Sequence, residues 1–120
     1  MKNGNLSNKT AKYVYIDAES LFNFKVMTVL KPGVNDKIRL LLREFNVCLF
    51  LDKRSRRLRL ELLSVVLNTN VFFDKRKNLA EELEKVGAIF LVSMDRVFEF
   101  KDIKNVYPFE LSVNSIKELI

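Results

Sequence analysis

Three short apolar runs in this sequence each end in an aspartate, and this repeated pattern constrains the fold more than any other feature. The runs are Tyr13–Ile16, Val47–Leu51 and Val71–Phe73, and they are followed by Asp17, Asp52 and Asp74. A short continuous apolar run is typical of a strand that is covered on both faces of a parallel sheet. Ligands of such sheets bind beyond the carboxyl ends of the strands. If the three strands are neighbours, their carboxylates meet at one edge of the sheet.

Amphipathic segments alternate with these runs and predict helices. After a turn at Lys31-Pro32-Gly33, Asn35 is expected to cap a helix whose apolar residues are Ile38, Leu41, Leu42 and Phe45. Further helices are predicted over about residues 55–67, from Leu79 to Val86 with Gly87 as the C-cap, and over Val113–Leu119. Additional strands are expected at Phe24–Leu30, at Ala88–Val92 and, as an edge strand, at Val97–Phe100. This alternation predicts an α/β fold, a three-layer α/β/α sandwich with a mainly parallel, Rossmann-like sheet.

The length and composition indicate a single domain with restricted chemistry. Residues 1–11 are polar and are expected to form a flexible tail before one α/β domain at residues 12–120. The absence of histidine, with Cys48 as the only cysteine, excludes histidine-based triads, zinc clusters and an intramolecular disulfide. No run approaches the roughly 20 apolar residues of a membrane span, and no signal peptide is apparent, so a cytoplasmic location is expected.

The candidate catalytic residues are carboxylates. Asp17 and Glu19, at positions i and i+2 after a strand, can face the same crevice, where one attacks or binds metal and the other transfers a proton. Asp74 can bind Mg²⁺ opposite Asp17, because this hard cation prefers carboxylate oxygens. The alternatives are structural: Asp17 or Asp74 caps the turn or helix that follows, and Glu19 is a solvated surface residue.

A basic run follows the second predicted strand, in a chain with a net charge of +6. Lys53, Arg54 and Ser55 are predicted to bind phosphate, and Arg56, Arg57 and Arg59 to form an anionic-ligand surface. These residues indicate a phosphorylated substrate or a nucleic acid as the partner. A solvated helix face is the alternative.

The order of Tyr13–Asp17, Lys31-Pro32-Gly33-Val34, Val47–Leu51 and Val71–Asp74 resembles the haloacid dehalogenase-like (HAD) superfamily, in particular its small capless branch with the carboxy-terminal-domain phosphatases. The resemblance implies a magnesium-dependent phosphohydrolase-like domain in which Asp17 is the nucleophile and Asp74 helps to hold Mg²⁺. Glu19 stands where the family's second aspartate, the general acid/base, is expected. This replacement is consistent with a catalytically degenerate member.

Two other classes remain open. Ile16–Leu21 is also similar to the opening of metal-dependent nucleases of the PIN-like and NYN type, which gather acidic residues at the edge of a parallel sheet. A third possibility is a non-catalytic subunit whose basic face binds nucleic acid or protein. The turn at Lys31-Pro32-Gly33 favours the phosphatase-like scaffold.

Overall fold

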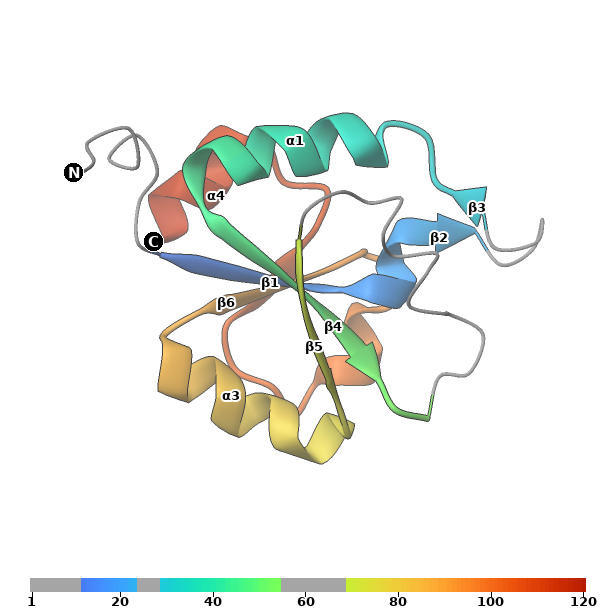
Figure 1. Cartoon of the computed structure of the whole chain (residues 1–120), viewed down its shortest axis with the longest axis vertical. Coiled ribbons are helices and arrows are strands. Elements are labelled where there is room, and N and C mark those ends of the chain that lie inside the picture. Colours follow the sequence, from blue (N-terminus) through green and yellow to red (C-terminus); the bar gives the residue numbers. More distant parts are fainter. Residues whose placement is uncertain (1–11, 24–28, 55–68) are drawn as a thin grey trace.

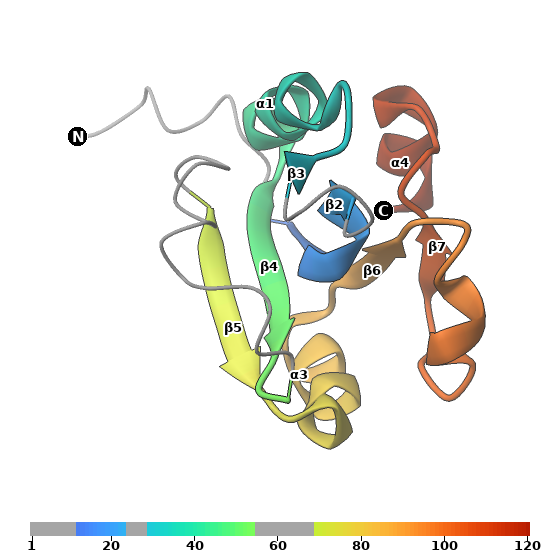
Figure 2. The ribbon, with the colours of Figure 1, turned by 90° about the vertical axis from the view of Figure 1, so that its right-hand side faces the viewer.

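The central element of the computed structural model, which describes residues 12–23, 29–54 and 69–120, is a five-stranded sheet in which every pair of neighbours is parallel. Its order is β5 (Asn70–Asp74), β4 (Asn46–Asp52), β1 (Tyr13–Asp17), β6 (Ile89–Val92) and β7 (Val106–Pro108). Figure 2 shows the succession from β5 at one edge to β7 at the other. The first strand of the chain is therefore the central strand of the sheet.

Helices cover both faces of this sheet (Figure 1). The helices α1 (Val34–Glu44) and α4 (Val113–Leu119) lie on one face, and α3 (Leu79–Val86) lies on the other. The predicted three-layer α/β architecture with a parallel sheet is confirmed. Within the described residues, no helix is long and apolar enough to cross a membrane.

Alternating side chains of the inner strands β4, β1 and β6 pack into two separate apolar clusters. Val14 and Ile16 of β1 are fully buried in the cluster that includes Ile38 and Leu41 of α1. Tyr15, between them in sequence, belongs to the cluster on the other face together with Leu79 of α3. This division follows from the two-residue period of a strand, and it explains why the strands read as continuous apolar runs.

The chain leaves β1 through a 3-10 helix, η2 (Ala18–Leu21), and a short antiparallel pair, β2 (Phe22–Asn23) and β3 (Val29–Leu30). The backbone N–H of Lys31 donates to the carbonyl of Leu21 at 2.8 Å and closes this excursion. The extended run predicted at 24–30 is confirmed at Val29–Leu30; the remainder lies outside the described residues.

The prediction that Asn35 caps α1 is wrong. The N-cap is Gly33, which adopts the left-handed conformation (φ 80°) that glycine accepts at no steric cost, and Asn35 lies within the first turn of the helix. At the end of α3 the prediction is confirmed: Gly87 is the left-handed C-cap (φ 73°), and its N–H donates to the carbonyl of Leu83 at 2.8 Å. The helix predicted over 55–67 lies outside the described residues.

The predicted edge strand at Val97–Phe100 is also wrong, because this segment is a 3-10 helix, η5. A turn at Ser93–Arg96 leads directly into it, and the N–H of Glu99 donates to the carbonyl of Arg96 at 3.0 Å. These local hydrogen bonds replace the ladder that a strand would need. The edge strand is instead β7, whose Pro108 is tolerated at an edge.

The reactivity of the buried Cys48 thiol tests the packing of the sheet against α3. Burial raises the pKa of its thiol to about 11. At pH 8 the native protein should therefore react with iodoacetamide about 100-fold more slowly than the urea-unfolded chain, because only the thiolate attacks. Mass spectrometry of alkylation against time measures both rates. Equal rates in the two states would show that β4 is not covered as described.

Candidate functional site

Asp17 ends the central strand and is almost completely buried, with 2% of its surface exposed. The helix η2 begins at the next residue and turns Ser20 back toward the Asp17 carboxylate. The Ser20 hydroxyl donates to Oδ2 of Asp17 at 2.7 Å and accepts from the backbone N–H of Ser93 at 2.9 Å. Ser20 therefore connects the ends of two neighbouring strands, β1 and β6.

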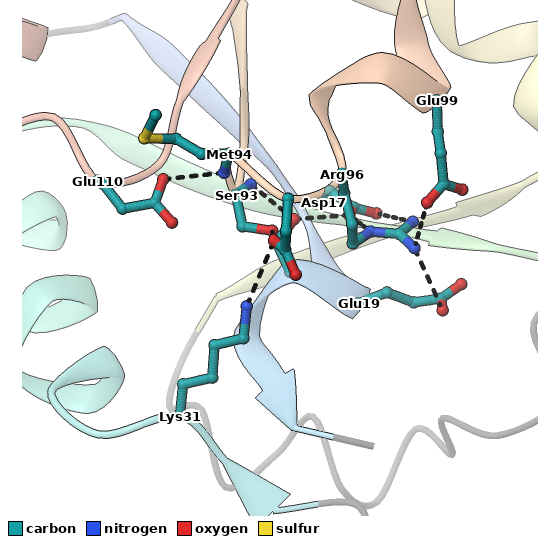
Figure 3. Close-up of polar contacts among 10 residues, drawn as sticks. Asp17, Glu19, Lys31, Ser93, Met94, Arg96, Glu99 and Glu110 are labelled. Atoms are coloured by element: carbon teal, nitrogen blue, oxygen red, sulfur yellow. Dashed lines mark hydrogen bonds and ion pairs between the residues drawn. The ribbon is translucent and has the colours of Figure 1, made fainter. Parts of the chain in front are cut away.

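Arg96 provides the positive charge at this site (Figure 3). Its Nε donates to Oδ2 of Asp17 at 2.7 Å, and its Nη2 lies 3.5 Å from Oδ1. The guanidinium also forms ion pairs with Glu99 at 3.1 Å and Glu19 at 3.8 Å. One guanidinium thus serves three carboxyl groups, which come from the end of β1, from η2 and from η5.

Burial disfavours the charged form of both partners of this ion pair, and it therefore shifts their pKa values in opposite directions. It raises the pKa of Asp17 above its ordinary value, although the Arg96 guanidinium and the Ser20 hydroxyl favour the charged form. Burial alone would lower the pKa of Arg96, but Asp17, Glu19 and Glu99 together raise it. The guanidinium therefore keeps its charge inside the protein.

The structure brings Asp17 and Glu19 together, as their spacing predicted. Both carboxylates lie against the same Arg96, and Glu19 is mostly shielded from solvent. Arg96 is thus a shared partner of both carboxylates. Neither carboxylate forms a side-chain cap of η2, so the capping alternative does not account for Asp17.

The structure does not bring Asp74 close to Asp17. Strand β4 lies between their strands, and the register pairs Asp17 with Phe50 but Asp74 with Asp52, two residues farther along. With about 4.8 Å between strands and about 3.3 Å per residue, the two Cα atoms are roughly 12 Å apart.

Asp74 also has local partners. Its carboxylate accepts from the backbone N–H of Lys75 at 2.6 Å and from the Asn78 amide at 2.8 Å. The Asn78 hydrogen bond, the largest effect, lowers the pKa of Asp74. These contacts favour the structural alternative, in which Asp74 holds the turn that follows β5.

The described residues do not fit a magnesium ion shared by Asp17 and Asp74. The oxygens of Asp17 already accept from Arg96 and Ser20. In the described part of the chain, no group of three or more acidic or cysteine side chains could hold a metal. Mg²⁺ binding remains a prediction, and it would require Arg96 to release Asp17.

Two of the three predicted phosphate-binding residues, Lys53 and Arg54, are among the described residues, and they follow β4 rather than the central strand that carries Asp17. Lys53 and Arg54 are exposed in the turn after β4, where Arg54 forms an ion pair with Asp52 at 3.6 Å. The other members of the predicted basic surface lie outside the described residues: Ser55, Arg56, Arg57 and Arg59.

Sequence reasoning did not identify Arg96, Ser20 or Ser93 as members of this site. Ser20 follows Asp17 by three residues, and Ser93 and Arg96 follow an apolar run that was recognised as a strand. The polar residues that follow this strand were the one sequence feature that pointed to the site. They could have been assigned to it only if the position of β6 beside β1 had been known.

Removing the guanidinium should destabilise the fold, because it leaves Asp17 buried without its charged partner. We expect Arg96→Met, which keeps the aliphatic stem, to lower the free energy of unfolding by about 3 kcal/mol. The double variant Asp17→Asn/Arg96→Met should lose less than the sum of the two single variants. Urea unfolding of the four proteins measures this coupling. Additive losses would show that the ion pair has no mutual stabilisation.

Asp17 should also give stability a specific pH dependence. Its pKa in the folded protein is raised above 3.8, so its contribution to stability is greatest below that value and is lost as the pH rises through the folded pKa. The stability of the wild type relative to Asp17→Asn should therefore fall as the pH rises above about 4. Urea unfolding of both proteins at a series of pH values above about 4 measures how the difference in their free energies of unfolding changes with pH. A difference that grows with pH would contradict it.

Comparisons with known proteins leave the family of this chain open. No protein-family model matches it, and neither a curated protein nor a solved structure is significantly similar to it. The resemblance to the haloacid dehalogenase-like superfamily therefore stays a prediction. Functional inference for this chain rests on the contacts that surround Asp17.

Proposed function

We propose that this chain is a non-catalytic binding domain built on a phosphohydrolase-like scaffold. The observation that carries the proposal is the buried ion pair between Asp17 and Arg96, which occupies the carboxylate at the end of the central strand. In an open parallel sheet, this is the position from which a side chain can act on a bound ligand. Here the position is filled by a contact within the protein.

The geometry around Asp17 disfavours nucleophilic attack. A carboxylate nucleophile needs a free oxygen about 3–3.5 Å from the reacting atom. Oδ2 of Asp17 accepts from both Ser20 and Arg96, and Oδ1 faces the second guanidinium nitrogen at 3.5 Å. The neighbouring strand β6 is followed by Ser93, whose hydroxyl donates to the carboxylate of Asp95. Asp95 also forms an ion pair with Lys31 at 3.7 Å, so this carboxylate too is occupied by contacts within the protein. These features support a scaffold that binds without turnover.

A magnesium-dependent phosphohydrolase is the second candidate, with Asp17 as the nucleophile and Glu19 as the acid/base. The proximity of both residues to Arg96 favours it, because the guanidinium could stabilise a phosphoryl group if it moved away from Asp17. The same carboxylates would serve a PIN-like or NYN-like nuclease. Both alternatives require a free Asp17 carboxylate.

Phosphatase assays distinguish the binding domain from the phosphohydrolase. We expect no magnesium-dependent hydrolysis of p-nitrophenyl phosphate by the wild type, by Asp17→Asn or by the matched control Asp36→Asn, which alters an exposed carboxylate on α1. Cleavage of labelled RNA with Mg²⁺ tests the nuclease in the same proteins. Activity that is present in the wild type and Asp36→Asn but lost in Asp17→Asn would overturn the proposal.

A further inference from the structure

Two adjacent turns at the carboxyl edge of the sheet carry exposed cations. Lys53 and Arg54 follow β4, and Lys75 and Lys77 follow β5. The strands are in register at Asp52 and Asp74, and the N–H of Lys53 donates to the carbonyl of Asp74 at 3.1 Å. The two turns are therefore fixed side by side. We refer to Lys53, Arg54, Lys75 and Lys77 as the β4/β5 basic edge.

The carboxylates of these turns are occupied locally. Asp52 accepts from the N–H of Arg54 at 3.0 Å, and Asp74 accepts from Lys75 and Asn78. Among the described residues, Lys53, Lys75 and Lys77 form no ion pair. Four positive charges against two negative ones leave this edge net positive, which favours a polyanion.

An exposed aromatic ring lies beside these cations. Phe73 of the edge strand β5 has 47% of its surface exposed, and Nζ of Lys53 lies 5.8 Å from the centroid of its ring. Phe72, the preceding residue, packs instead against Tyr15 and Phe50. Phe73 is thus the aromatic side chain of this strand that can receive a ligand.

We infer that Phe73 and the β4/β5 basic edge form a binding surface for single-stranded nucleic acid. An exposed ring can stack on an unpaired base of any type, while cations beside it contact the flanking phosphates. The bases of a duplex are already stacked and paired, so they cannot reach a ring on a strand edge. An acidic protein would engage the charges without needing Phe73. The inference names the partner class of the proposed binding domain, but it does not depend on whether Asp17 is catalytic.

Fluorescence anisotropy with labelled poly(U) RNA and poly(dT) DNA of twenty nucleotides tests the surface. We expect Phe73→Ala to weaken binding of the single strand about 5- to 150-fold without changing the salt dependence, because it removes stacking alone. The double variant Lys53→Gln/Lys75→Gln should weaken binding and reduce the slope of log affinity against log salt by about 1.4.

Matched variants elsewhere control for nonspecific effects. Phe98→Ala removes an equally apolar ring that is 64% exposed on η5, and Lys101→Gln/Lys104→Gln removes two other exposed lysines. Both controls should bind as the wild type does, and thermal unfolding confirms that every variant is folded. Wild-type affinity in Phe73→Ala would overturn the inference, as would equally tight binding of a duplex or of polyglutamate. Phosphatase activity would overturn the proposed non-catalytic role but leave this surface intact.

Discussion

The buried ion pair between Asp17 and Arg96 determines what the carboxyl edge of this sheet can do. Removing two charges from water is costly, and the cost is offset only when the geometry is good and the remaining polar atoms have partners. Here Ser20 supplies the additional donor to Asp17, and Arg96 lies over the ring of Phe100 at 5.8 Å. Because Ser20 also accepts from Ser93, the same network joins the central strand to β6. At the carboxyl ends of β1 and β6, these polar side chains are therefore hydrogen-bonded to one another.

The strand register divides the rest of this edge from that network. Strands β4 and β5 end in register with each other, two residues beyond the level of Asp17. Asp52 and Asp74, the last residues of these strands, and the β4/β5 basic edge that follows them therefore lie beyond the level of Asp17. Three carboxylates that share a sequence pattern consequently have different roles. Asp17 is buried against a guanidinium, whereas Asp52 and Asp74 accept hydrogen bonds from the turns that follow them.

The sequence predicted the parts of this structure that local periodicity controls. Apolar runs located β1, β4, β5 and β6, and the spacing of Asp17 and Glu19 placed both at one site. Arg96 could not be predicted in the same way, because its role depends on β6 lying beside β1, and strand order is not a local property. The prediction of an edge strand at Val97–Phe100 was wrong for a related reason. The apolar residues of this segment suit a strand, but the hydrogen bonds of the preceding turn continue into a 3-10 helix.

Electrostatics gives the two regions of the edge different affinities for anions. Around Arg96, three carboxyl groups face one guanidinium, so a further phosphate would meet a negative excess there. The β4/β5 basic edge has the opposite balance. The Cα atoms of Asp17 and Asp74 are roughly 12 Å apart, farther than the Debye length of about 8 Å at physiological ionic strength, so the field of each region is largely screened at the other. This charge balance supports the proposed binding of a polyanion at the turns after β4 and β5 rather than at Asp17. Loss of a free carboxylate at the centre is thus compatible with anion binding at the side.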